Sequence, residues 1–80
     1  MDDRQLVSRI EELAAEEHRL EQSHVGEGLN AEETERLRSL EVALDQCWDL
    51  LRQRRARRSV GEDPDRAEAR PPEVVERYRQ

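Results

Sequence analysis

Side chains of the types that bind metal ions are few in this chain, and their spacing keeps them apart. His18, His24 and Cys47 are the candidates, because imidazole and thiolate groups are preferred zinc ligands. On a helix, the separation of the two histidines turns them roughly 240° from one another. Cys47 lies about 25 Å along the second predicted helix from the turn that holds His24. We therefore predict no metal site and interpret Cys47 as a small apolar core residue.

The carboxylates are numerous, but their spacing does not direct them at one substrate. They occur as adjacent pairs such as Glu11-Glu12, and adjacent helical residues point about 100° apart. Glu21 and His24 have the Glu-x-x-His spacing of a di-iron ligand pair, yet they lie at the end of a predicted helix and no facing Glu completes the site. Because the chain also has no nucleophile–base set and no Gly-rich phosphate loop, we expect a non-enzymatic protein without a cofactor.

An arginine run is the strongest charge feature of the sequence. Five arginines occur within residues 52–58 without an acid, namely Arg52, Arg54, Arg55, Arg57 and Arg58. One interpretation is a solvated helix end that complements the helix dipole and pairs with acids further along the chain, namely Glu62, Asp63 and Asp65. The other is a partner-binding surface for an acidic protein or for nucleic acid. Trp48, the only tryptophan, fits either core or dimer packing or a hot spot beside those arginines.

The charge distribution favours a protein partner over nucleic acid. Residues 1–51 carry a net charge of −9, residues 52–58 carry +5 and residues 59–80 carry −2. A phosphate-binding face needs a broad positive field, which an acidic body with one basic cluster does not provide. No aromatic residue lies among the arginines to stack on bases.

Two helices must position these residues. The first predicted helix covers residues 3–23 and has an apolar stripe with helical spacing. The second covers residues 31–58 and has a longer stripe of the same kind. Asn30 and Glu33 have the spacing of a capping box at the start of the second helix, and glycines favour a turn over residues 24–30. The expected core residues are Leu6, Ile10, Leu13, Leu20, Leu37, Leu40, Leu44, Cys47 and Leu51.

These elements predict an all-α fold, an antiparallel and coiled-coil-like helical hairpin over residues 1–60. No run of β-branched or aromatic residues exists to make a sheet. A simple register places Asp3 opposite Leu51, so that Arg52–Arg58 projects past the first helix. Residues 61–80 are expected to form a linker with a short C-terminal helix or a disordered tail. Pro71-Pro72 is a possible helix start.

Apolar residues beside the two stripes predict self-association. A two-helix hairpin buries one seam and leaves its flanks partly exposed. Pairing two hairpins into a four-helix bundle would cover them, which predicts a homodimer. The flanking residues are Val7, Val42, Trp48 and Leu50.

The sequence also predicts the cellular compartment of the protein. A single cysteine cannot form an intramolecular disulfide, which favours a reducing environment. The start, Met1-Asp2-Asp3, is acidic where a secretory signal would be basic, and no apolar run is long enough to span a bilayer. We expect a cytoplasmic protein that does not enter membranes.

Several segments together resemble one known family. They are the EELAAEEHRL segment, the block Leu44–Arg52, the arginine run, Asp63-Pro64-Asp65 and a closing Val75-Glu76-x-Tyr78. The chain resembles the small actinobacterial proteins catalogued as domain of unknown function 2630. The resemblance implies a cytoplasmic actinobacterial helical protein and implies no activity. We expect a small interaction or adaptor protein that self-associates and presents its arginine-rich helix end to an acidic protein partner. The alternative is a nucleic-acid accessory protein that uses the arginines as a phosphate clamp.

Overall fold

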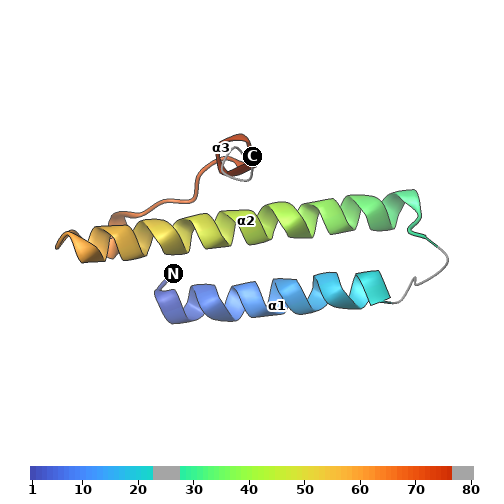
Figure 1. Ribbon diagram of the computed structural model, residues 1–80, viewed down its shortest axis with the longest axis horizontal. Helices are drawn as coiled ribbons and strands as arrows, with labels where there is room; N and C mark the ends of the chain where they lie inside the picture. Colours follow the sequence, from blue (N-terminus) through green and yellow to red (C-terminus); the bar gives the residue numbers. More distant parts are fainter. Residues whose placement is uncertain (23–27, 77–80) are drawn as a thin grey trace.

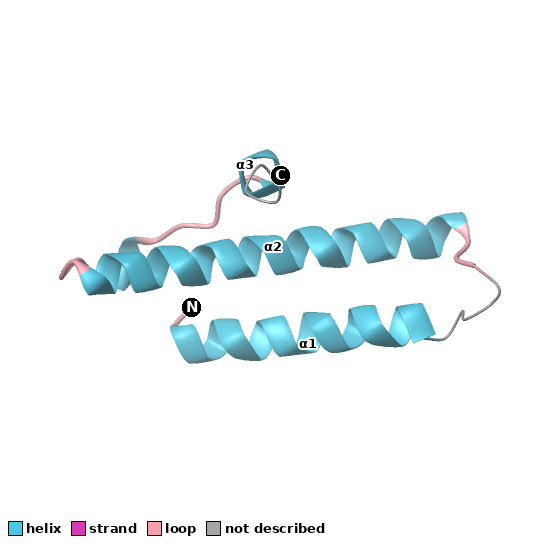
Figure 2. Cartoon of the chain, in the orientation of Figure 1, coloured by secondary structure: helices cyan, strands magenta, loops and turns pink. Residues whose placement is uncertain are grey.

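The fold is a helical hairpin whose C-terminal segment folds back onto the second helix. The structure is a computed structural model and describes residues 1–22 and 28–76. Helix α1 spans Asp3–Gln22 and helix α2 spans Ala31–Ser59, followed by a 3-10 turn, η1, over Pro64–Arg66 and a short helix, α3, over Pro72–Glu76. The two long helices lie side by side and antiparallel (Figure 1). The predicted all-α hairpin is confirmed, and no strand occurs among the described residues (Figure 2).

Both long helices begin with a reciprocal capping box. At α2, the Glu33 N–H donates to Asn30 Oδ1 at 2.8 Å and the Asn30 N–H donates to Glu33 Oε1 at 3.1 Å, as the spacing predicts. At α1, Asp2 and Gln5 exchange the same two bonds, at 2.8 and 2.9 Å. These bonds satisfy backbone donors that the first helical turn leaves free. Most of the predicted turn, together with His24, lies outside the described residues.

Helix α2 ends in a tight turn that sends the chain back along the helix. Gly61 adopts φ +78°, a left-handed conformation that favours glycine. The Gly61 N–H donates to the Arg58 carbonyl at 3.2 Å, and the Glu62 N–H donates to the Arg57 carbonyl at 2.8 Å. This pair of bonds is the Schellman pattern of helix ends. It reverses the chain direction and so determines where the following residues lie.

The hydrophobic core lies where α1 and α2 meet. Leu6, Ile10 and Leu51 form one cluster, with Leu44, Cys47 and Leu50 packed against it. Leu13 and Leu40 are also buried. The remaining expected core residues, Leu20 and Leu37, are half-buried, as are Leu44 and Cys47. Of the flanking residues, Val7 and Trp48 remain exposed, by 38% and 45%.

Residues after Gly61 return along α2 on the side away from α1 (Figure 1). This segment contains η1, an extended stretch over residues 67–71 and then α3, where Val75 is buried. The described part of residues 61–80 includes one short helix, α3. Residues 77–80 lie outside the described part. The chain is elongated, with extents of 50 × 24 × 17 Å. No helix among the described residues has both the length and the apolar character needed to cross a membrane.

Candidate interaction surface

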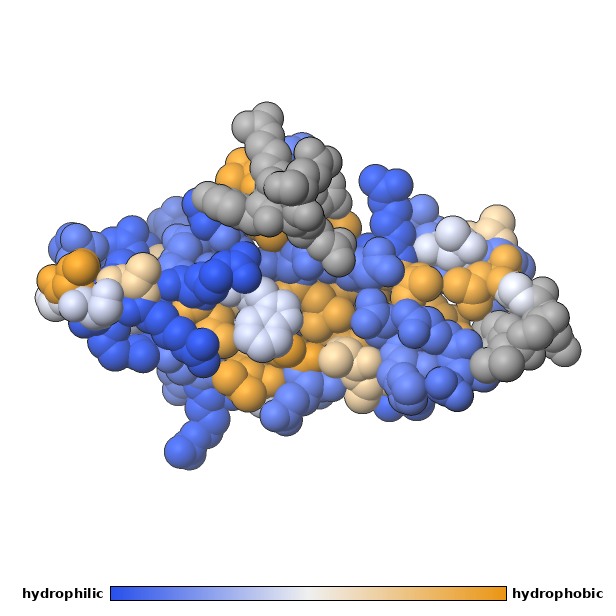
Figure 3. Space-filling model, in the orientation of Figure 1, coloured by the Kyte–Doolittle hydropathy of each residue, from blue (hydrophilic) through white to orange (hydrophobic). Residues whose placement is uncertain are grey.

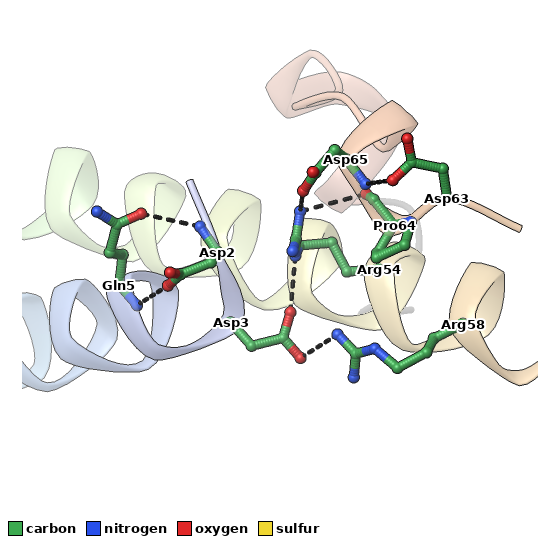
Figure 4. Close-up of polar contacts among 8 residues, drawn as sticks. All are labelled: Asp2, Asp3, Gln5, Arg54, Arg58, Asp63, Pro64 and Asp65. Atoms are coloured by element: carbon green, nitrogen blue, oxygen red, sulfur yellow. Dashed lines mark hydrogen bonds and ion pairs between the residues drawn. The ribbon is translucent and has the colours of Figure 1, made fainter.

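Arg54 is the centre of the arginine run and is almost fully buried, with 6% of its surface exposed. Its Nε donates to Asp3 Oδ1 at 2.7 Å, and its Nη1 donates to Asp65 Oδ1 at 2.9 Å and to the Pro64 carbonyl at 3.2 Å. Figure 4 shows the guanidinium between the start of α1 and the η1 turn. One side chain of α2 therefore connects the two segments that flank this helix.

Two more arginines of the run form internal ion pairs. Arg58 Nη2 donates to Asp3 Oδ2 at 2.6 Å, and Arg57 Nη1 donates to Glu62 Oε2 at 3.2 Å. Hydrogen bonds from Arg54 and then Arg58 lower the pKa of Asp3 below its ordinary value. Asp3 and then Asp65 in turn raise the pKa of Arg54. Arg54, Arg57 and Arg58 therefore support the fold.

Side chains of the arginine run reach back across the simple register. Asp3 bonds to Arg54 and Arg58, which lie about one and two helical turns beyond Leu51, the residue expected opposite Asp3. Long helical side chains lean toward the helix N-terminus, so arginines beyond the predicted contact can reach back to the first turn of α1. The end of α2 does extend past the start of α1 (Figure 1), but Arg54 and Arg58 do not project freely, because both side chains bond to Asp3.

The expected pairing of arginines with later acids is found for two of the three acids. Glu62 and Asp65 pair with Arg57 and Arg54. Asp63 instead accepts a hydrogen bond at Oδ1 from the Asp65 N–H, at 2.9 Å, and caps the η1 turn (Figure 4). The acids after α2 thus hold the returning chain as well as neutralising the helix end.

A second polar cluster fastens the returning chain to the middle of α2. Asp49 is fully buried and accepts two hydrogen bonds from Arg70, one of them from Nε at 2.8 Å. Gln53 Nε2 donates to Asp49 Oδ2 at 2.9 Å and to the Glu68 carbonyl at 2.8 Å. Gln46 Nε2 donates to the Arg70 carbonyl at 3.2 Å. The Arg70 hydrogen bonds lower the pKa of Asp49. We call these four side chains the clasp.

Sequence reasoning did not single out the clasp, although one signal was available. Gln46, Asp49 and Gln53 are spaced by three and four residues, which places them on one face of α2, opposite the leucine stripe. A polar stripe with helical spacing is common on solvated helices. Only its hydrogen bonds to Arg70 and Glu68 show that the polar stripe of α2 is covered by the returning chain.

Two arginines of the run remain available. Arg52 and Arg55 are exposed, and neither forms an ion pair with any residue that the structure describes. They lie four and seven positions after Trp48, and therefore share its face of α2. We call the surface made by Trp48, Arg52 and Arg55 the Trp48 face. On the side of the molecule shown in Figure 3, apolar side chains gather along the line between the two long helices, with hydrophilic side chains around them.

The candidate metal ligands do not form a cluster in the described part of the chain. No group of three or more His, Cys, Asp or Glu side chains there is arranged to hold a metal ion. His18 is exposed on α1, and Cys47 is half-buried in the seam. Burial raises the pKa of the Cys47 thiol above its ordinary value, which keeps the thiol protonated and a weak nucleophile.

Fold and contacts together define an all-α hairpin braced by its own C-terminal segment. The chain belongs to the family described as "Protein of unknown function (DUF2630)", whose model matches residues 2–80. Three uncharacterized mycobacterial proteins, one from Mycobacterium bovis and two from strains of Mycobacterium tuberculosis, are each 47% identical to it over 77 residues. The alignment covers 95% of this chain and 88% of each relative. No solved structure matches the chain.

Proposed function

We propose that this is a small, non-enzymatic helical interaction protein that self-associates and binds an acidic protein surface through the Trp48 face. One observation carries the proposal. Arg52 and Arg55 have no ion-pair partner among the described residues, while the other three arginines of the run do, and both lie beside a tryptophan that is 45% exposed. Tryptophan and arginine are among the residue types enriched in the hot spots of protein interfaces.

The position of the Trp48 face on α2 supports the proposal. α1 and the returning segment cover two other sides of α2, through the core at Leu51 and the clasp at Asp49. The Trp48 face lies between these covered sides and is open. A partner can therefore reach it without displacing either contact.

The alternative is a nucleic-acid accessory protein, with the same two arginines as a phosphate clamp. Two available guanidinium groups can neutralise few phosphates, and the acidic residues of the body oppose a long phosphate backbone. We also expect the protein to act in the cytoplasm, as a homodimer of actinobacterial origin with coiled-coil-like packing. The single cysteine supports the expected cytoplasmic location, and the mycobacterial relatives support the expected actinobacterial origin.

Reversing the charge of the Trp48 face tests the proposed function. The tagged R52E/R55E variant is compared in cross-linking capture with R19E/R66E, which has the same change in charge. Arg19 and Arg66 are exposed, and neither side chain forms an ion pair with a described residue. We expect R52E/R55E to lose the captured proteins and R19E/R66E to retain them.

Two outcomes of this experiment would contradict the proposal. Retention of every captured protein by R52E/R55E would show that the Trp48 face is not the binding surface. Capture that disappears after nuclease treatment, and that falls steeply with salt, would instead support the phosphate clamp.

A further inference from the structure

The charges along the Trp48 side of α2 form an evenly spaced pattern. Glu41 lies seven residues before Trp48, and Arg55 lies seven residues after it. Heptad spacing places all three on one stripe of the helix, with each charge about 10 Å from the tryptophan along the axis. Glu41 is half-buried and Arg55 is exposed, and neither forms an ion pair within the described residues. The stripe therefore has a negative end, an aromatic centre and a positive end.

This pattern is complementary to itself in one relative orientation only. If a second α2 lies antiparallel across the stripe, a two-fold axis at Trp48 places each Glu41 opposite the Arg55 of the other copy. A parallel arrangement would place glutamate opposite glutamate and arginine opposite arginine. Closed dimers with a two-fold axis use the same patch on both copies, which is the condition this stripe meets.

Apolar surface lies next to the stripe. Trp48 and Val7 are two of the large apolar side chains that remain exposed among the described residues, by 45% and 38%. Arg9 and Leu13 of α1 line a groove with Ala43 and Leu50 of α2. Val7 and Trp48 lie on the faces of their helices turned away from that groove. They consequently share one side of the hairpin, where a second copy would cover both.

We propose that the acidic group bound by the Trp48 face is Glu41 of a second copy of this chain, whose own Trp48 face binds Glu41 of the first copy in return. The two α2 helices are then antiparallel, with the two-fold axis at Trp48 and Glu41 of each copy against Arg55 of the other. This inference rests on the proposed function, since it names the partner of the same surface. Covering Trp48 at the axis supplies apolar burial, and the flanking ion pairs set the orientation.

Charge reversal at the two ends of the stripe tests the arrangement, with molar mass measured by sedimentation equilibrium over a concentration series. We expect the unaltered chain to dimerise. E41R alone and R55E alone should each weaken dimerisation roughly tenfold, because each creates two like-charge contacts in its own dimer. An equimolar mixture of the two variants should restore the affinity. In the mixed dimer both contacts again join opposite charges.

Control variants and a second signal separate interface effects from folding. E35R and R66E reverse exposed charges outside the stripe, and we expect them to dimerise like the unaltered chain. Circular dichroism checks that every variant retains its helices. Trp48, as the only tryptophan, should show blue-shifted fluorescence as the chain is concentrated, and the shift should be absent in R55E at the same concentration.

Three results would overturn the inference. They are a monomer at every concentration, a dimer that neither reversal weakens, and a mixture no tighter than the single variants. A monomer that still captures another protein, and loses it in R52E/R55E, would remove self-association but leave the proposed binding of a partner through the Trp48 face standing. If the unaltered chain is a monomer and R52E/R55E captures the same proteins as the unaltered chain, both proposals are contradicted.

Discussion

At the residue scale, the chemistry of arginine explains how Arg54 and Arg70 hold separate segments together. A guanidinium has five donors in a rigid planar fork, so it can bond in several directions at once. Arg54 uses this to reach Asp3, Asp65 and the Pro64 carbonyl, and Arg70 bonds both carboxylate oxygens of Asp49. Lysine, with a single point charge on a flexible stem, could not reproduce either arrangement.

Asp49 makes a pH-dependent contribution to stability. Its pKa in the fold is below the ordinary 3.8, so its ionised form stabilises the fold fully above that value. The contribution is lost as pH falls through the lower folded pKa. We expect D49N to reduce the free energy of unfolding by about 1–2 kcal/mol at neutral pH. This loss is smaller than for a fully buried ion pair, because Arg70 is partly exposed and solvent screens its charge.

The measurement is thermal unfolding between neutral pH and pH 2. The stability of the unaltered chain should approach that of D49N as the pH falls below the aspartate range. E35Q, which removes an exposed carboxylate, should follow the unaltered chain throughout. Parallel profiles for D49N and the unaltered chain would show that Asp49 is not held ionised by Arg70.

At the scale of elements, the capping boxes determine where both long helices begin. Asn30 satisfies a backbone donor that the first turn of α2 leaves free, and Glu33 returns the bond. We expect N30A to lower the free energy of unfolding by about 1 kcal/mol, the usual loss for an N-cap. Urea denaturation followed by circular dichroism measures it. S39A, at an exposed position inside the same helix, should change stability by less than about 0.5 kcal/mol; an equal loss in both variants would contradict the role of the cap.

The elements differ in how far the sequence alone can predict them. The helices and the Asn30 cap depend on residues three or four positions apart, so their patterns are visible in the sequence. The clasp joins Asp49 to Arg70, 21 residues away, and nothing in its local spacing distinguishes it from a solvated stripe. The contact of Asp3 with Arg54 was missed for a similar reason. It depends on the reach of a long side chain, which a residue-by-residue register ignores.

At the scale of the whole molecule, α2 is the central element of three aligned segments. α1 packs on one side of it and the returning chain on another (Figure 1). This explains why Leu51 and Asp49, only two positions apart and on different faces, are both buried. The returning chain thus functions as part of the fold, although α3, its one α-helix among the described residues, is only five residues long.

Burial of Val75 should hold the returning chain in place. Val75 is 2% exposed, so V75S removes apolar contacts and introduces a hydroxyl where α3 meets α2. We expect a loss of about 2 kcal/mol in the free energy of unfolding. We also expect faster hydrogen exchange in the segment 64–75, measured by mass spectrometry. V60S makes the same change at a side chain that is 70% exposed and should have little effect; similar losses in both would show that α3 does not stabilise the fold.

The extended stretch over residues 67–71 has a consequence for how readily proteases cleave the chain. Proteases bind their substrates as extended strands, and this stretch already has that shape. It also follows Arg66, where a trypsin-like enzyme would cut before Ala67. Two of its carbonyls, those of Glu68 and Arg70, instead accept hydrogen bonds from the side-chain amides of Gln53 and Gln46. The rate of cleavage at Arg66 would then report how often the clasp opens, so the same contacts that complete the fold would also protect this stretch from cleavage.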